Sequence, residues 1–279
     1  MIVLETDIAK ARQPQRKLPN VITSFNWAGW EKYGKKFVES WKQYWPETIR
    51  LTIYYEGDEF DGFDFPTGIS WRPIEEVEFL SDFMESLRFP IMHGIVGDQY
   101  DINFDARMAR KSFMQVHTAR KYGGKVFWLD ADSITTKHVP QGFLDECLPD
   151  DKFCCYLGRD GWYYTESGFL GFNADHPIAR EFFKNYLHAF ITGVIFAQAP
   201  RYDEKGRLAG GGWHDCIAFD CTRMLAAMNG KEGEFVNLAS HVTPGHMHPF
   251  QVSAPGQYMM HLKGDRKNTG KLRPEDLRG

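Results

Sequence analysis

The chain has 279 residues, of which 43% are hydrophobic, 15% aromatic and 25% charged. This composition excludes a disordered or fibrous protein and suffices for one sizeable core, so we expect a single domain spanning residues 1–279. The formal net charge of −4 gives no overall attraction to nucleic acid or anionic lipid.

The N-terminal part of the sequence alternates between strand and helix patterns. Apolar, β-branched runs predict strands over residues 20–25 and 49–55, and apolar positions at helical spacing predict a helix over residues 31–45 between them. This order is the beginning of a right-handed parallel sheet. Residues 56–73 are acidic and rich in Gly and Phe, which indicates a loop over one edge, and a short helix is expected over residues 74–87.

The second part continues the alternation. A helix is predicted over residues 105–122, ending at Gly123-Gly124, and a wholly apolar strand over residues 125–129. We further expect strands over residues 153–157 and 168–172, helices over residues 177–191 and 215–228, and a mostly loop-like remainder from residue 231. The sequence therefore predicts an α/β fold with a mostly parallel central sheet flanked by helices.

Charge is unevenly distributed. Residues 47–86 carry 11 acidic and 2 basic side chains, residues 101–125 carry 6 basic and 2 acidic ones, and residues 261–279 carry 6 basic and 3 acidic ones. Two basic segments in an acidic protein favour a bounded anion site, such as a diphosphate pocket, over a nucleic-acid footprint. The alternative is that both segments are solvated surface.

No membrane or disulfide signature is apparent. The first residues do not resemble a signal peptide, and the longest apolar stretch, residues 190–199, falls short of the roughly 18 residues that a membrane span needs. Five cysteines without a CxxC pair indicate buried thiols. We expect no membrane insertion and a cytoplasmic location, in a bacterium or in its host if a phage encodes the protein.

Asp130 and Asp132 directly follow the apolar strand over residues 125–129. Ligands bind at the carboxyl ends of strands in open α/β sheets, and two carboxylates one residue apart can turn toward one hard cation. Mg²⁺ or Mn²⁺ keeps positions for water and substrate phosphates, so this pair would present a nucleotide diphosphate. The alternative is an ordinary loop or helix cap.

Two segments resemble a known enzyme family. Residues 125–136, KVFWLDADSITT, resemble the DxD segment of GT-A glycosyltransferases, and residues 261–267, HLKGDRK, resemble the HxxGxxK element of the glycogenin-like and galactosyltransferase-like GT-A families. The resemblance implies a Rossmann-like GT-A fold and a Mn²⁺ or Mg²⁺ ion. The implied metal ligands are Asp130, Asp132 and His261, and the implied diphosphate contact is Lys267. On physical grounds, Gly264 would let the backbone approach a phosphate, and Lys263 or Lys267 would supply compensating charge. Asp130 and Ala131 are further candidate donor contacts.

The resemblance to GT-A enzymes implies further donor contacts at the end of the first strand and on one helix. Thr23, Ser24 and Phe25 end the first strand, where GT-A enzymes hold the nucleobase and ribose. Arg107 and Lys111 are four residues apart on a predicted helix, from which they would reach the donor sugar and diphosphate. The alternative for this pair is ordinary surface charge.

Two carboxylates are candidates on the acceptor side. Glu166 lies in a segment that resembles the GT-A acceptor pocket, and Asp215 begins a predicted helix after three glycines. Asp215 can cap that helix, act on the acceptor, or both. An inverting enzyme needs a general base, for which Asp215 precedes Glu166 as a candidate, whereas the His261 element favours retention. His241, His246 and His248 indicate an irregular loop rather than a zinc site.

The implied reaction transfers a hexosyl or pentosyl group from a nucleoside diphosphate sugar, with a UDP-sugar expected, to a hydroxyl acceptor. That acceptor is a glycan, a protein or a hydroxymethylated DNA base. Residues 20–130 would form the nucleotide-sugar-binding half, and residues 131–279 the acceptor half with the C-terminal metal and diphosphate element. Two alternatives are a metal-dependent phosphohydrolase acting on nucleotide sugars and a non-catalytic nucleotide-sugar-binding protein.

Overall fold

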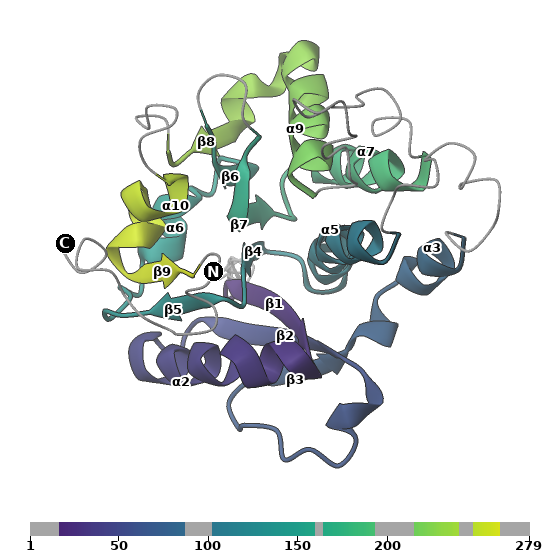
Figure 1. Cartoon of the computed structure of the whole chain (residues 1–279). Coiled ribbons are helices and arrows are strands. Elements are labelled where there is room, and N and C mark those ends of the chain that lie inside the picture. Colours follow the sequence, from purple (N-terminus) through teal and green to yellow (C-terminus); the bar gives the residue numbers. More distant parts are fainter. Residues whose placement is uncertain (1–16, 87–101, 160–163, 193–214, 240–247, 263–279) are drawn as a thin grey trace, which may run out of the picture.

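A seven-stranded sheet in the order β3-β2-β1-β4-β7-β6-β8 forms the centre of the protein (Figure 1). The computed structural model describes residues 17–86, 102–159, 164–192, 215–239 and 248–262, with only the backbone described for residues 102–107. The strands of the sheet are β1 (Asn20–Asn26), β2 (Arg50–Glu56), β3 (Ser70–Pro73), β4 (Lys125–Leu129), β6 (Cys154–Leu157), β7 (Glu166–Asn173) and β8 (Phe235–Asn237).

Most neighbouring strands run parallel. β3, β2, β1 and β4 are parallel to one another, as are β6 and β8, whereas β7 runs antiparallel to both of its neighbours, β4 and β6. The expected α/β fold with a mostly parallel central sheet flanked by helices is confirmed. One sheet also includes strands from both predicted halves of the chain.

Helices cover both faces of the sheet (Figure 1). One face carries α1 (Trp27–Gly29), η1 (Trp30–Gly34), α2 (Lys35–Tyr44), α6 (Phe143–Cys147) and α10 (Pro249–Val252); the other carries η3 (Ile74–Glu76), α3 (Leu80–Ser86), α5 (Ile102–Tyr122), α7 (Ala179–Thr192) and α9 (Asp215–Ala226). The remaining short helical turns are η2 (Asp58–Phe60), η4 (Ala227–Lys231), η5 (Glu232–Glu234) and η6 (Ala254–Gln257).

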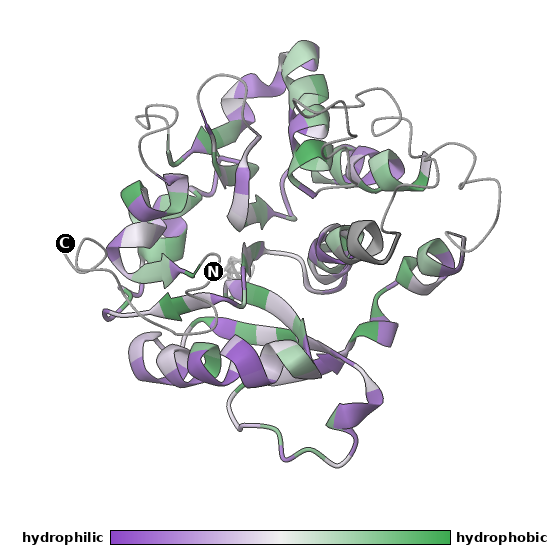
Figure 2. Cartoon of the chain, in the orientation of Figure 1, coloured by the Kyte–Doolittle hydropathy of each residue, from purple (hydrophilic) through white to green (hydrophobic). Residues whose placement is uncertain are grey.

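The pattern of β4 follows from burial on both faces. Val126 and Trp128 pack toward α5, and Phe127 and Leu129 pack toward the opposite helix layer, because successive side chains of a strand point to opposite faces. The helix α2 lies on the surface and therefore alternates between hydrophilic and hydrophobic residues along its length (Figure 2).

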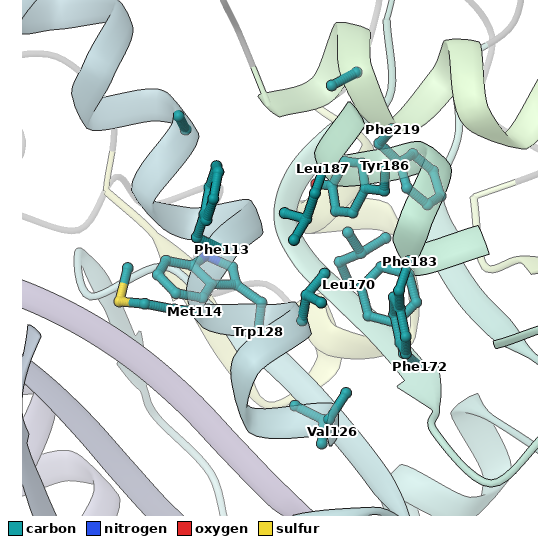
Figure 3. Packing of buried hydrophobic residues seen from close by; sticks show 14 of the residues in the cluster. Phe113, Met114, Val126, Trp128, Leu170, Phe172, Phe183, Tyr186, Leu187 and Phe219 are labelled. Carbon is teal, nitrogen blue, oxygen red and sulfur yellow. The ribbon is translucent and has the colours of Figure 1, made fainter. Parts of the chain in front are cut away.

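Aromatic packing fixes the helices that carry the site. On the α5 side, side chains from α5, β4, β7, α7 and α9 form one cluster (Figure 3). Phe172 of β7 lies 5.4 Å from Phe183 of α7, and Tyr186 of α7 lies 6.4 Å from Phe219 of α9, measured between ring centroids. Burial of these rings holds α7 against β7 and α9 against α7.

The expected loop over residues 56–73 is partly wrong. Ser70–Pro73 form β3, which is the edge strand of the main sheet beside β2. All four residues of β3 are only partly buried, and a proline ends the strand. A short, half-exposed edge strand carries little hydrophobic alternation, which explains why its pattern resembles that of a loop.

The remainder from residue 231 is also less irregular than expected. β8 joins the main sheet beside β6, and β9 (Met259–His261) pairs with β5 (Ser133–Thr135) in a separate two-stranded sheet. Each of these strands has three residues, too few to show a period. None of the helices in the described part of the chain has the length and hydrophobicity needed to cross a bilayer.

Candidate active site

The pairing of β5 with β9 brings Asp132 and His261 together. Asp130 and Asp132 follow β4, and the chain continues into β5, which pairs antiparallel with β9. In that register Ser133 lies opposite His261, and the backbone N–H of Leu262 donates to the carbonyl oxygen of Asp132 at 2.9 Å. Segments far apart in the sequence are thereby fixed side by side at the carboxyl end of β4.

Three possible ligand atoms converge there. His261 Nε2 lies 3.3 Å from Asp130 Oδ2 and 2.9 Å from Asp132 Oδ1. In an octahedral shell with bonds of about 2.0–2.1 Å, neighbouring ligand atoms are about 3.0 Å apart. The spacing and the donor types therefore fit one hard divalent cation, with positions left open for other ligands.

The protonation of His261 reflects its two carboxylate partners. Burial alone would lower the pKa of His261, but the hydrogen bonds and charges of Asp130 and Asp132 outweigh burial and raise the pKa from 6.5 to about 9. In the absence of an ion, a proton on the imidazole thus balances the carboxylates. A metal ion at this point would replace that proton.

Protein donors hold the other oxygen of Asp130. Trp128 Nε1 donates to Asp130 Oδ1 at 2.5 Å, and Lys111 Nζ donates to the same atom at 3.0 Å. Burial raises the pKa of this carboxyl, but the charge of Lys111 and the contacts with His261 outweigh burial and hold the pKa well below its usual range. Asp130 is therefore ionised near neutral pH, as a metal ligand must be.

Lys111 of α5 joins the Asp pair to α9. Its Nζ lies 3.1 Å from Asp215 Oδ2, donates to the carbonyl oxygen of Ser167, and lies 5.0 Å from the centroid of the Trp128 ring. Burial would lower the pKa of Lys111, but Asp130 and Asp215 outweigh burial and raise it. Lys111 is thus an enclosed cation, which excludes the alternative of ordinary surface charge for this residue.

Glu166, the first residue of β7, lies on the far side of His261. Its Oε1 lies 3.6 Å from His261 Nδ1 and accepts from the N–H of Gly168 at 3.2 Å. Its Oε2 accepts from Arg159 Nη2 at 2.6 Å and lies 2.9 Å from His248 Nε2. Glu166, His248 and His261 form a second group of possible metal ligands, but the guanidinium of Arg159 against Glu166 disfavours a further cation.

Sequence reasoning did not assign Arg159 or His248 to the site. Arg159 follows β6, and His248 precedes α10 in the stretch interpreted as an irregular loop. No motif marks either residue, because only the tertiary arrangement of β6, β7 and α10 places both beside Glu166. The histidine cluster as a whole lies outside the described residues apart from His248.

Gly168 allows the close approach of His261. A Cβ atom at this position would lie 2.8 Å from both Cε1 and Nδ1 of His261 and 3.1 Å from Glu166 Oε1. Ordinary van der Waals contact needs more than 3.4 Å, so any larger residue must push the imidazole aside.

We expect Gly168→Ala to lower the free energy of unfolding by about 1–3 kcal/mol, the usual cost of overpacking a filled site. Chemical denaturation measures this change. Gly233→Ala is the matched control, because nothing lies within 4 Å of a Cβ atom at Gly233. Equal unfolding free energies for the two variants would show that the contact with His261 does not restrict residue 168.

The structure brings part of the predicted residue set together. Thr23 and Phe25 of β1 are buried, Ser24 is half-buried, and Ala131 is buried between the two aspartates. The residues gathered at the end of β4 are Lys111, Asp130, Asp132, Glu166, Asp215 and His261. The side chain of Arg107 and all of Lys263, Gly264 and Lys267 lie outside the described residues, and every donor or acceptor contact stays a prediction.

No protein-family model matches the chain, and no curated protein matches it. Solved structures do resemble it. The apo form of mouse xyloside xylosyltransferase 1 is 10% identical with a TM-score of 0.44, and the match covers 78% of this chain and 84% of that chain. A glycosyltransferase involved in the glycosylation of the major capsid of PBCV-1 is 12% identical with a TM-score of 0.47, and the match covers 91% of this chain and 99% of that chain.

A third structure is the apo form of the bifunctional glycosyltransferase WbbM, which is 9% identical with a TM-score of 0.47. That match covers 90% of this chain but only 47% of WbbM. All three proteins are glycosyltransferases. At these identities and TM-scores the likeness does not assign an activity to this chain.

Proposed function

We propose that this chain is a metal-dependent GT-A glycosyltransferase that moves a sugar from a nucleoside diphosphate sugar, with a UDP-sugar expected, to a hydroxyl acceptor. One observation carries the proposal: Asp130 and Asp132 of the DxD-like segment meet His261 of the HxxGxxK-like segment at one point. The two segments resemble the same family separately, and their convergence supports a common role.

The metal site would consist of Asp130, Asp132 and His261. Mn²⁺ or Mg²⁺ bound there supplies positive charge that stabilises a departing nucleoside diphosphate. Lys263, Gly264 and Lys267 follow β9 in the sequence and are proposed to contact the diphosphate, with Arg107 of α5 as a further cation. Residues 20–130 are proposed as the nucleotide-sugar half, with Thr23, Ser24 and Phe25 near the nucleobase.

The acceptor side is proposed to lie around Asp215 and Glu166 in residues 131–279. Lys111 Nζ lies 3.0 Å from Asp130 Oδ1 and 3.1 Å from Asp215 Oδ2, and this shared partner supports a role for Asp215 beside the proposed metal site. A retaining reaction is favoured by the His261 element, and in an inverting one Asp215 would take the proton of the acceptor hydroxyl. The acceptor is proposed to be a glycan, a protein or a hydroxymethylated DNA base.

Mn²⁺ binding is expected to strengthen as pH rises. Because the metal needs a neutral imidazole and the pKa of His261 is raised to about 9, binding below that pH displaces one proton. The dissociation constant is expected to fall about tenfold per pH unit between about pH 7 and 8.5 and to level off above about pH 9. Electron paramagnetic resonance of free Mn²⁺, recorded without oxygen, measures it at each pH.

In the metal-free protein, by contrast, the contribution of His261 to folding stability falls as pH rises. A His261 pKa raised above 6.5 stabilises the fold fully below pH 6.5, and this contribution is lost as pH rises through about 9.

The His261→Asn variant is the control for the pH dependence of Mn²⁺ binding, since it has no proton to displace at this position. A Mn²⁺ affinity of the native protein that is flat from pH 7 to 9 would contradict the assignment of His261 as a ligand.

The proposed function is tested by a screen of UDP-, GDP- and CMP-sugars with Mn²⁺ or Mg²⁺, with glycan, protein and DNA acceptors. We expect one donor to release free nucleotide, and Asp132→Ala to abolish the release. A transferase acting on a UDP-sugar leaves UDP, whereas a phosphohydrolase that cleaves the diphosphate leaves UMP and a sugar phosphate. The second product set, or no release together with no metal-dependent thermal shift, would overturn the proposal.

A further inference from the structure

Glu166 is enclosed behind the imidazole that faces the Asp pair. We propose, on the basis of the proposed function, that Glu166 is a positioning residue that fixes the ring orientation and tautomer of His261 for metal binding. This role is distinct from the acceptor contact suggested by its sequence segment. It concerns the side of His261 opposite Asp130 and Asp132.

The two nitrogens of His261 face different partners. Nε2 lies within 3.3 Å of both Asp130 and Asp132, whereas Nδ1 lies 3.6 Å from Glu166 Oε1. When Nε2 binds a metal, the single proton of the neutral imidazole must be on Nδ1. That atom is buried without a hydrogen bond in the described structure, and a shift of about 0.4 Å brings it within reach of Oε1.

The carboxylate of Glu166 is itself held in place. The N–H of Gly168 donates to Oε1, and Arg159 donates to Oε2. The preceding residue, Thr165, donates to Asp220 of α9 through both its N–H at 2.8 Å and its hydroxyl at 2.7 Å. The contacts of Thr165 and the N–H of Gly168 thus keep Oε1 beside the imidazole, whereas Arg159 bonds the other oxygen, Oε2.

The chemistry fits a known requirement of metal-bound histidines. Such a histidine donates its second ring N–H to an oxygen acceptor, and a carboxylate in that place both sets the tautomer and strengthens the ligand. The alternative is that Glu166 only anchors Arg159 and His248 to β7 through Oε2. The two roles use different oxygens of the same side chain, so they can be separated by substitution.

Mn²⁺ affinity of the full chain, measured by electron paramagnetic resonance without any donor, tests this role. We expect Glu166→Gln to weaken binding about 10–100-fold, the usual range for loss of such a partner, and Glu166→Asp to recover part of it. Arg159→Gln and His248→Asn remove the partners of Oε2 and are expected to change the affinity less than about threefold. Equal losses in Arg159→Gln, His248→Asn and Glu166→Gln would overturn the proposal in favour of the anchor.

A second measurement does not depend on the folding of a variant. In the Mg²⁺-saturated native protein, the Nδ1 proton of His261 is expected to give a ¹H–¹⁵N signal that is shifted downfield by a hydrogen bond to Glu166; an Nδ1 proton without that shift would overturn the proposal. Asp132→Asn separates this inference from the proposed function. If Asp132→Asn loses Mn²⁺ but Glu166→Gln does not, only the positioning role fails; if neither variant changes Mn²⁺ binding, both proposals fail.

Discussion

Asp132→Asn is expected to lower the rate of nucleotide release from the donor at least about a hundredfold. Asp132 is buried, and its Oδ1 lies 2.9 Å from His261 Nε2. The amide keeps the shape of the side chain but removes the charge that a divalent ion requires, and metal stabilisation of a leaving group is worth several kcal/mol. Steady-state kinetics at several Mn²⁺ concentrations measure the loss.

Asp151→Asn is the matched control for this substitution. Asp151 is an exposed carboxylate whose partner, Lys152, lies 3.7 Å away. We expect its rate to match that of the native protein, because an exposed ion pair contributes little. If Asp132→Asn retained the native rate at saturating donor, Asp132 would not be a metal ligand in the reaction.

Lys111→Met is expected to lower the free energy of unfolding by about 3–5 kcal/mol. The ammonium lies 3.0 Å from Asp130 Oδ1 and 3.1 Å from Asp215 Oδ2, and its side chain is 10% exposed. Methionine fills similar space but leaves the buried carboxylate of Asp215 and the partly buried one of Asp130 without their common cation. Denaturation by urea in the presence of a metal chelator measures the change.

Lys121→Met, on the same helix, provides the comparison. Lys121 is 40% exposed and lies 3.3 Å from Glu76, so its loss is expected to cost less than about 1 kcal/mol. Mn²⁺ is expected to restore part of the stability lost in Lys111→Met, because the ion neutralises Asp130. It is expected not to change the difference in unfolding free energy between Lys121→Met and the native protein. Equal destabilisation by the two substitutions would contradict the ion-pair bridge between α5 and α9.

The centre of the fold could be predicted because its elements have strong local patterns. β4 is buried on both faces and is therefore apolar throughout, so the aspartates that follow it stand out. The two glycines Gly123 and Gly124 likewise predict the end of α5, because they adopt φ values of +62° and +70° that other residues rarely adopt. These local patterns predict that Asp130 and Asp132 lie at the edge of the sheet where ligands bind.

The contacts of the site could not be predicted in the same way. The sequence around Lys111 is compatible with a donor contact or with surface charge, because nothing local shows that Asp130 and Asp215 converge on this residue. β9 has three residues and no period, so only the family resemblance of residues 261–267 points to His261. The cluster around Glu166 joins Arg159, which follows β6, to His248 and His261, which are distant from Glu166 in the sequence.

Calorimetric titration of UDP, GDP and CDP into the native protein, with and without Mn²⁺, tests the central claim most directly. If Asp130, Asp132 and His261 present a metal ion to a nucleoside diphosphate, one of the three nucleotides binds the native protein only when Mn²⁺ is present. The same nucleotide is expected not to bind Asp132→Asn in either condition. Binding that is equally tight with and without Mn²⁺, or no binding of any of the three, would contradict the claim.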